Sequence, residues 1–445
     1  MKPKTLFCEF SQYVALNICG MLGLSCYILA DTFFVSKGVG AEGLAALNLA
    51  IPLYSFVHGI GLMLGMGGAT KYSIFMGQGQ CRQANRCFWA MLSLAAGFAA
   101  AFMAAGLFLA EPIARLLKAD GEVFGMTKTY LQVILLFSPA FIMNEILICF
   151  VRNDGSPKLS MAAMLAGSLA NILFDYLLIF PMGMGILGAV LATGFAPVIG
   201  MGILSRHWTS GKSHIRMGKL SFSPELAAAA LGLPYLITEV ASGLVMIVFN
   251  LLILRLKGNI GVAAYGVVAN LSLVVASVYA GIAQGSQPII SRAYGQGDGS
   301  GGKKALAYGA VTALALSGMI YLVFFIWAEG IVGIFNSGHS MELQQIAEGG
   351  LKLYFTAMPF AGANVVLSAY FAAVEQALPA QAISLSRGFL IIIPMALLLS
   401  FALGMDGIWL SCPVTEFLVS VMGLKYLTKG QFFSSFFTGR NKKTR

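Results

Sequence analysis

The sequence predicts an all-α polytopic membrane protein with twelve transmembrane helices in two six-helix lobes related by pseudo-twofold symmetry. Three observations support this fold class. Hydrophobic residues make up 58% of the 445 residues and charged residues only 10%, whereas soluble domains carry about 25% charge. Twelve apolar runs are long enough to cross a bilayer. The pattern of the first six runs also returns in the second six.

Each predicted span is a run of about 20 or more predominantly apolar residues. Prolines fall inside many of the runs, which membrane helices tolerate when neighbouring groups satisfy the freed backbone. The 52 glycines favour close helix contacts in lipid. In chain order, the predicted spans are 11–36, 44–70, 87–110, 128–151, 160–181, 186–206, 226–255, 262–290, 304–327, 349–373, 382–403 and 406–427.

The distribution of Lys and Arg predicts the orientation in the membrane. With the N-terminus inside, 21 of the 28 Lys and Arg residues fall on the cytoplasmic side. The net charge of +10 therefore reflects topology and attraction to anionic lipids at the cytoplasmic face, and not nucleic-acid binding. We expect a multi-pass protein of the inner (cytoplasmic) membrane with both termini in the cytoplasm.

The two halves of the chain repeat each other. The segment GLAA at 43–46 matches GVAA at 261–264, and the same offset of 218 places Gly77-Gln78-Gly79 on Gly295-Gln296-Gly297. Six spans per half restore the same side of the membrane, so the repeats are parallel. The predicted parts are an N-terminal lobe (1–206), a cytoplasmic linker (207–225), a C-terminal lobe (226–427) and a basic cytoplasmic tail (428–445).

Two aspartates, Asp31 and Asp175, lie in long apolar runs of the first half. A carboxylate in hydrocarbon costs several kcal/mol unless it is paired, hydrated or protonated. In the second half, the repeat places Phe249 opposite Asp31 and Leu397 opposite Asp175. The scaffold does not need these acids, which favours a functional role over one of capping or bridging helices.

Three further polar residues are expected near the same depth. Asn171 and Asp175 are four residues apart and share one helix face. Asp31 and Asp175 lie roughly 8–9 Å below the predicted outer boundary. Thr193 and Tyr130 approach that boundary from their own spans. We predict one polar pocket in which protonation of the carboxyl groups changes hydrogen bonds and biases the lobe between two shapes.

Three other acids lie inside predicted spans: Glu145, Glu239 and Glu416. Glu239 is mid-membrane and is a candidate for binding a cationic substrate or a second cation. It could instead be satisfied by backbone groups or by Ser242. Glu145 could pair near the inner end of its span, and Glu416 has the weakest functional signal.

Other motifs carry little weight. The segment GDGSGGKK at 297–304 nearly matches a phosphate loop, but Lys304 stands where Ser or Thr is needed. We expect a turn there, and no cofactor. The four histidines are dispersed and form no HExxH motif. The seven cysteines are scattered and odd in number, so we expect free thiols and no metal site.

The chain resembles the multidrug and toxic compound extrusion (MATE) family over nearly its whole length. The stretches that carry the resemblance are LADTFFVSKGVGAEGLAALNLAIP, VRNDGSPKLSMAAMLAGSLANILFDYLLIFPMGMGILGAVLAT and GIAQGSQPIISRAYGQGD. The pattern is most similar to the bacterial branch whose ion site is in the N-terminal lobe.

The resemblance implies an ion-coupling site made of Asp31, Asn171, Asp175, Thr193, Tyr130 and Asn144. Asp31 and Asp175 would bind a metal ion only if the coupling ion is sodium. Some sodium-linked members pair a span-7 glutamate with a span-10 aspartate. Glu239 fills the first role here, but the tenth span offers only Asn364, Ser368 and Tyr370, which argues against that second site.

The expected function is antiport: export of bulky, often cationic organic compounds by alternating access, coupled to H⁺ more than Na⁺. The alternative within the same broad superfamily is a flippase for a lipid-linked precursor or metabolite, which the near absence of Lys and Arg from the spans disfavours. A lipid-modifying enzyme would need metal or nucleotide motifs that are lacking, and a passive channel fits the unlike halves less well. We expect a monomer and no enzymatic activity.

Overall fold

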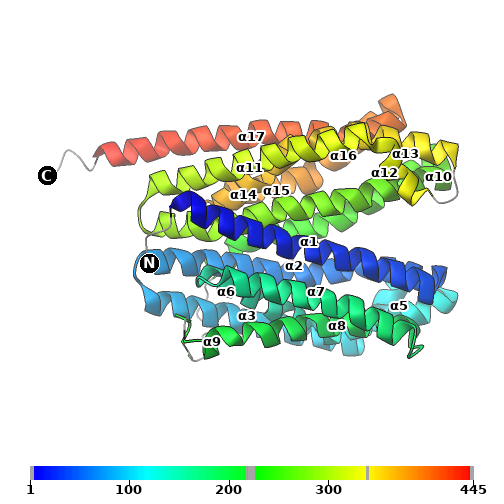
Figure 1. Cartoon of the computed structure of the whole chain (residues 1–445), viewed down its shortest axis with the longest axis horizontal. Helices are drawn as coiled ribbons and strands as arrows, with labels where there is room; N and C mark the ends of the chain where they lie inside the picture. The colour runs from blue at the N-terminus through cyan, green and yellow to red at the C-terminus, as the bar shows by residue number, and fades with distance from the viewer. Residues whose placement is uncertain (1–4, 212, 217, 219–225, 337–339, 441–445) are drawn as a thin grey trace. The chain divides into compact units, whose positions relative to one another are not determined.

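The computed structural model describes residues 5–211, 213–216, 218, 226–336 and 340–440, and all regular structure in these ranges is helical (Figure 1). Residues 212, 217 and 219–225 of the predicted linker and 441–445 of the predicted tail lie outside the described residues. The first nine helices are α1 (Leu6–Gly38), α2 (Ala41–Gly77), α3 (Cys81–Phe108), α4 (Ala110–Leu116), α5 (Gly121–Leu136), α6 (Ser138–Asn153), α7 (Pro157–Ile179), α8 (Gly185–Leu204) and α9 (Arg206–Thr209). The remaining elements are α10 (Leu226–Gly295), α11 (Gly299–Ile326), α12 (Ala328–Phe335), α13 (Met341–Tyr354), η1 (Phe355–Ala357), α14 (Met358–Ala373), α15 (Ala377–Leu385), η2 (Ser386–Leu390), α16 (Ile392–Leu403) and α17 (Met405–Arg440).

The predicted all-α membrane fold is confirmed, although the spans are grouped differently from the twelve separate runs expected. Among the described residues, ten helical stretches are long and apolar enough to cross a membrane, and the bent pair α5–α6 is an eleventh candidate. The difference arises because α10 carries two predicted spans, joined at Gly258, where φ is 61°. The 48° bend between α5 and α6 precedes Pro139 in the first turn of α6.

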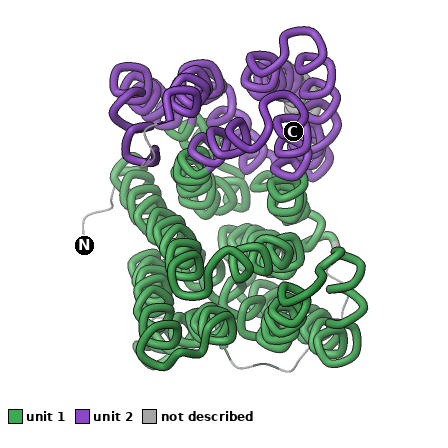
Figure 2. Tube along the Cα trace, turned by 90° about the vertical axis from the view of Figure 1, so that its right-hand side faces the viewer, with its two compact units in different colours: residues 1–244, 270–309, 372–375 green, residues 245–269, 310–371, 376–445 purple. Residues whose placement is uncertain are grey.

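Two compact units divide the chain (Figure 2). Unit 1 contains residues 1–244, 270–309 and 372–375, and unit 2 contains residues 245–269, 310–371 and 376–445. The division of the chain at 207–225 was inferred from the sequence repeat and not from contacts, and it stays a prediction.

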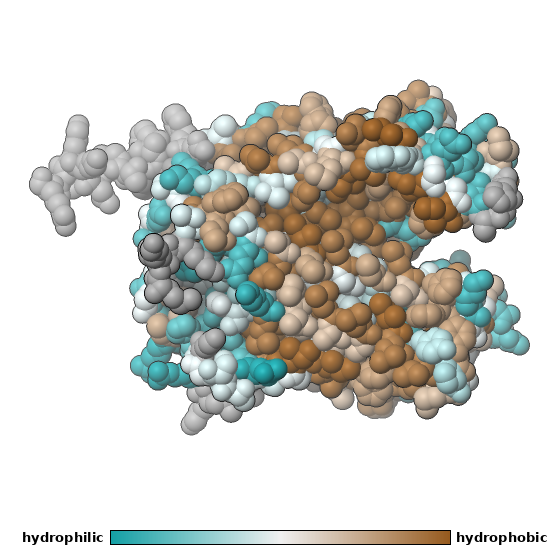
Figure 3. Space-filling view, in the orientation of Figure 1, coloured by the Kyte–Doolittle hydropathy of each residue, from teal (hydrophilic) through white to brown (hydrophobic). Residues whose placement is uncertain are grey.

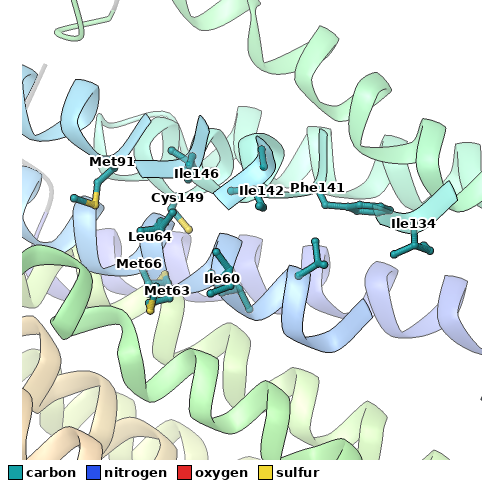
Figure 4. Close-up of a cluster of buried hydrophobic side chains, with 14 of the residues drawn as sticks. Ile60, Met63, Leu64, Met66, Met91, Ile134, Phe141, Ile142, Ile146 and Cys149 are labelled. Carbon is teal, nitrogen blue, oxygen red and sulfur yellow. The ribbon is translucent and has the colours of Figure 1, made fainter. Parts of the chain in front are cut away.

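The hydrophobic core of unit 1 surrounds the middle of α2 (Figure 4). Side chains of α2, α3, α5 and α6 gather there, all of them buried: Ile60, Met63, Leu64, Met66, Met91, Ile134, Phe141, Ile142, Ile146 and Cys149. Small residues set the close approach of α10 to α2. A Cβ atom on Gly232 would collide with the backbone oxygen of Met63, and one on Gly67 would collide with that of Ala228. Such contacts replace the hydrophobic driving force that is missing in lipid.

Unit 2 contains a buried polar cluster beside a π-helical turn. Arg387, in η2, donates from its Nε and a terminal nitrogen to Glu416 Oε1 at 3.1 and 2.7 Å. Asn364 Nδ2 donates to Glu416 Oε2 at 2.7 Å, and Ser420 Oγ donates to Asn364 Oδ1 at 3.0 Å. The carboxylate of Glu416 is therefore neutralised by a fixed internal cation.

The surface is apolar along the middle stretches of the helices, while hydrophilic side chains gather toward the helix ends (Figure 3). Large apolar side chains such as Phe401, 96% exposed, and Ile334, 79% exposed, are left mostly uncovered by the described part of the chain. Exposed apolar surface on this scale is unstable in water and suits contact with lipid. The chain is a multi-pass membrane protein.

Candidate functional site

Five of the six predicted ion-site residues occupy one buried region of unit 1. Four helices supply them. Asp31 of α1 is 8% exposed, Asn171 and Asp175 of α7 are fully buried, Thr193 of α8 is 6% exposed and Tyr130 of α5 is 4% exposed. Residues that lie far apart in the sequence are thus brought together by the packing of α7 against α1 and α8.

Glycines on α1 allow α7 to approach. A Cβ atom on Gly20 would lie 2.8 Å from Met164 Sδ, and one on Gly23 would lie 2.6 Å from Leu165 Cδ2. Either methyl group would displace the end of a flexible side chain of α7. The glycines therefore leave room for Met164 and Leu165 against α1, the helix that also carries Asp31.

The two carboxyl groups face each other closely enough that, if one were protonated, it would donate a hydrogen bond to the other. Both oxygens of Asp175 and Oδ1 of Asp31 are buried without a hydrogen-bond partner among the described residues. Buried carboxylate oxygens without a partner are rare in folded proteins because their desolvation is not repaid. No positively charged side chain among the described residues pairs with these carboxyl groups, and a proton or a hard cation could take that place.

Asn171 and Thr193 flank the carboxyl pair. Asn171 Nδ2 lies 3.4 Å from Thr193 Oγ1, to which it donates, and Thr193 Oγ1 donates to the backbone oxygen of Ala189 at 3.1 Å. Asn171 Oδ1 is buried and has no partner within the described ranges. Carboxylate and amide oxygens of this kind suit a proton or a hard cation such as sodium. No group of three His, Cys, Asp or Glu side chains that could hold a metal occurs in the described part of the chain.

Asn144 lies apart from the other five. It is half-buried on α6, and its Oδ1 has no hydrogen-bond partner in the described structure. A Cβ atom on Gly200 of α8 would lie 2.7 Å from this oxygen. Asn144 therefore packs against α8 at a glycine, and its role at the ion site stays a prediction.

Sequence reasoning missed two tyrosines beside the site. The hydroxyl groups of Tyr27 and Tyr54 lie 3.1 Å apart and share a hydrogen bond between α1 and α2. Tyr27 precedes Asp31 by four residues and interacts electrostatically with it. The i, i+4 spacing on one helix was the signal that could have identified Tyr27.

Glu239 and Glu145 meet a histidine that sequence reasoning had set aside. His58 Nε2 lies 3.6 Å from Glu145 Oε1, and His58 Nδ1 lies 3.7 Å from Glu239 Oε2. The imidazole ring is stacked on Tyr54, with ring centroids 5.9 Å apart and an interplanar angle of 20°. Glu145 is therefore paired, as expected, but its partner is a histidine that the sequence analysis gave no role. Ser242 donates to the backbone oxygen of Glu239 and leaves its carboxylate free for His58.

A second histidine cluster lies outside the spans, at the end of α6. Asp154 Oδ1 accepts a hydrogen bond from Tyr72 at 2.7 Å, and Oδ2 accepts one from the backbone nitrogen of His214 at 2.9 Å. His207 Nε2 lies 2.8 Å from Oδ2. Burial raises the pKa of Asp154, but the hydrogen bonds from His207 and Tyr72 outweigh it and hold that pKa below its usual range. The described start of the predicted linker is thereby held on unit 1.

The tenth span carries no free carboxylate among its described residues. Asn364 and Ser368 are buried, and Asn364 donates to Glu416. Because Arg387 already pairs with Glu416, this region of unit 2 does not resemble an ion site awaiting a cation. The weak functional signal assigned to Glu416 agrees with this structural pairing.

The fold and the buried carboxyl pair define a class of protein: a polytopic membrane transporter. The family model described as MatE matches residues 18–177 and 234–398. The chain belongs to the MatE family, whose members are transporters and not enzymes.

Known proteins resemble the chain over nearly its full length. The multidrug export protein MepA of Staphylococcus saprophyticus is 25% identical over 396 residues, covering 88% of this chain and 86% of that protein. MepA of Staphylococcus aureus strain MRSA252 is 24% identical, covering 89% and 88%. A solved structure of the MATE multidrug transporter DinF-BH, determined as a complex, has a TM-score of 0.87 and 26% identity, with 95% of both chains covered. The outward-facing conformation of a multidrug resistance MATE family transporter has a TM-score of 0.89 and 20% identity, again with 95% of both chains covered.

Proposed function

We propose that the chain is a cation-coupled antiporter that exports bulky, often cationic organic compounds, with Asp31 and Asp175 as its ion switch. One observation carries the proposal: three buried carboxylate oxygens of this pair have no hydrogen-bond partner among the described residues. A site that leaves such oxygens unpaired in an apolar span costs stability. Binding of an ion to these oxygens would offset the cost and shift the lobe between two conformations.

The proton is the proposed coupling ion. The two carboxyl groups face each other closely enough to share one, and a shared proton turns one oxygen into a donor. Ion entry from outside would favour outward release of substrate, and ion release inside would reset the carrier. Sodium is the alternative coupling ion, for which the unpaired oxygens of Asn171 and the carboxyl pair would be ligands.

The substrate class is proposed from relatives and not from a pocket. Two similar proteins bear the name multidrug export protein, and one similar structure is that of a multidrug transporter in a complex. We place the chain in the cytoplasmic membrane with both termini inside, as the excess of Lys and Arg on that side predicts. Anionic lipids would contact this basic face, and the chain would act as a monomer.

The test is transport by purified protein in liposomes. Wild type and Asp175→Asn would be reconstituted separately, and uptake of a fluorescent organic cation would be followed under a pH gradient alone and under a sodium gradient alone. Movement driven by the pH gradient, lost in Asp175→Asn, is the expected result. Asp120→Asn is a matched control, because Asp120 lies at the start of α5 without a side-chain capping bond.

Three results would overturn parts of the proposal. Movement only under the sodium gradient would keep the site and replace the coupling ion. Gradient-driven transport by Asp175→Asn at the wild-type rate would remove Asp175 from the mechanism. If no organic cation moved while a lipid-linked precursor did, the flippase function would take its place.

A further inference from the structure

Glycines of α2 bring two glutamates to opposite edges of one histidine. A Cβ atom on Gly61 would lie 3.1 Å from Glu145 Cβ of α6, and one on Gly59 would lie 3.2 Å from Glu239 Cβ of α10. These contacts are tighter than ordinary packing, so the glycines define the distance of both helices from α2. His58 directly precedes Gly59 in the sequence and reaches both carboxylates.

The cluster has more acidic groups than basic ones. Two carboxyl groups face one imidazole, so with both carboxyl groups ionised a net negative charge remains whether or not the imidazole holds an extra proton. The arginine on α6 is Arg152, about two helical turns further along than Glu145. Its guanidinium donates to Asn17 Oδ1 at 2.6 Å and to Gln284 Oε1 at 3.1 Å, not to either glutamate. Uncompensated negative charge inside a membrane span is costly and calls for a cation.

The imidazole of His58 makes only long contacts with the two carboxyl groups. Its nitrogens lie 3.6 and 3.7 Å from the carboxylate oxygens, longer than charge-assisted hydrogen bonds of about 2.7–2.9 Å. The side chains of His58 and Glu145 are 13% and 12% exposed, whereas that of Glu239 is 33% exposed. The cluster is therefore open at Glu239, and a ligand could enter there without unfolding a helix.

Aromatic rings form one wall of the cluster. Tyr54 stacks on the His58 ring, and Phe141 packs edge-on against Tyr54 at 5.5 Å between ring centroids. A flat ring between two carboxylates, with an aromatic face beside it, occupies the space that a flat organic cation would fill. Cations gain attraction from such aromatic faces as well as from the carboxylates.

We infer that Glu145 and Glu239 form a binding site for the charged group of an organic cation, and that the His58 ring is an internal occupant displaced by that cation. The inference rests on the proposed export of organic cations and adds a location for the cationic group. The tyrosine pair Tyr27–Tyr54 joins this site to the Asp31 region through one hydrogen bond. Displacement of His58 from Tyr54 would therefore alter the hydrogen bond that Tyr54 makes with Tyr27 on α1.

The test is equilibrium binding of ethidium to the purified, detergent-solubilised full chain, followed by fluorescence anisotropy at fixed pH. Glu145→Gln and Glu239→Gln each keep the shape of the side chain and remove its charge. We expect each to weaken binding by roughly tenfold or more, as loss of one partner in a buried charge contact does. Phenanthridine, the uncharged parent ring, should not compete with ethidium.

Two variants of the histidine form a matched pair. His58→Lys places a permanent cation between the glutamates and should abolish binding, whereas His58→Gln is neutral and should bind at least as tightly as wild type. Thermal melting of every variant separates loss of binding from loss of fold. The proposed cation site is wrong if Glu145→Gln and Glu239→Gln both bind ethidium as tightly as wild type does. It is also wrong if His58→Lys binds ethidium normally.

Asp175→Asn separates this inference from the proposed function. It keeps both glutamates and His58 and should lose gradient-driven transport, so the ion switch and the cation site are tested by different variants. Transport that survives in Asp175→Asn, together with binding lost in Glu145→Gln and Glu239→Gln, would reject the ion switch and keep the cation site. The opposite pattern, binding intact in both glutamine variants and transport lost in Asp175→Asn, would reject the cation site alone.

Discussion

The hydroxyl groups of Tyr27 and Tyr54 lie 3.1 Å apart and share a hydrogen bond that joins α1 to α2. Each tyrosine precedes a candidate functional residue by one helical turn: Tyr27 precedes Asp31, and Tyr54 precedes His58. The bond therefore connects the proposed ion site with the proposed cation site. The contribution of this hydrogen bond to transport can be measured directly, because replacing either tyrosine by phenylalanine keeps the ring and removes only the hydroxyl.

Tyr27→Phe should uncouple substrate movement from the ion gradient. Loss of this hydrogen bond leaves the half-buried hydroxyl of Tyr54 without its partner, at about 1 kcal/mol. That energy corresponds to a roughly fivefold lower initial rate of gradient-driven transport in liposomes. Tyr176→Phe is the control, since Tyr176 is 51% exposed on α7. A wild-type rate in both Tyr27→Phe and Tyr54→Phe would show that the link has no functional role.

Gly232→Ala should prevent stable folding of unit 1. Its new methyl group would collide with the backbone oxygen of Met63 on α2, and a backbone atom cannot rotate away. Gly243→Ala in the same helix meets nothing within 4 Å and should be neutral or stabilising by up to about 1 kcal/mol. The measurement is the yield of monodisperse protein and its melting temperature in detergent. Equal stability of the two variants would contradict the close approach of α10 to α2.

Asp154→Asn should lower the melting temperature, because it removes a carboxylate that accepts hydrogen bonds from Tyr72 and His214. The sign of the pH dependence follows from the pKa, which is lower in the folded chain than in the unfolded chain. The stabilisation by the carboxylate is fully present above the unfolded pKa of about 3.9 and is lost as the pH falls through the lower folded pKa. The difference between wild type and variant should therefore shrink as the pH falls into the acid range. A difference that grows below about pH 4 would have the wrong sign.

Glu416→Gln should destabilise unit 2 by about 3–5 kcal/mol, because it leaves the buried guanidinium of Arg387 without its charge partner. The double variant Arg387→Met, Glu416→Leu removes both charges and should recover most of the lost stability. Thermal or denaturant unfolding in detergent gives both values. Gradient-driven transport should persist in the double variant, and its loss would show that unit 2 takes part in ion coupling.

The membrane fold could be predicted from the sequence because it depends on local composition. Runs of apolar residues such as 160–181 need no partner to be recognised as membrane segments. The carboxyl pair could be predicted for the same reason, since Asp31 and Asp175 are conspicuous in apolar surroundings wherever the helices pack. Asn171 followed from its spacing of four residues from Asp175.

Tertiary structure alone decided which helix faces meet. The pairing of His58 with Glu145 and Glu239, that of Arg387 with Glu416, and that of Asp154 with His207 and His214 join residues from different helices or loops, and no periodicity in the sequence reports such contacts. The physical reason is that glycine contacts, such as Gly61 against Glu145, set helix separation and rotation only after the helices have associated. The sequence by itself therefore determined the membrane class and the polar residues of the first lobe. The packing decided which charged groups are paired and which have no partner among the described residues.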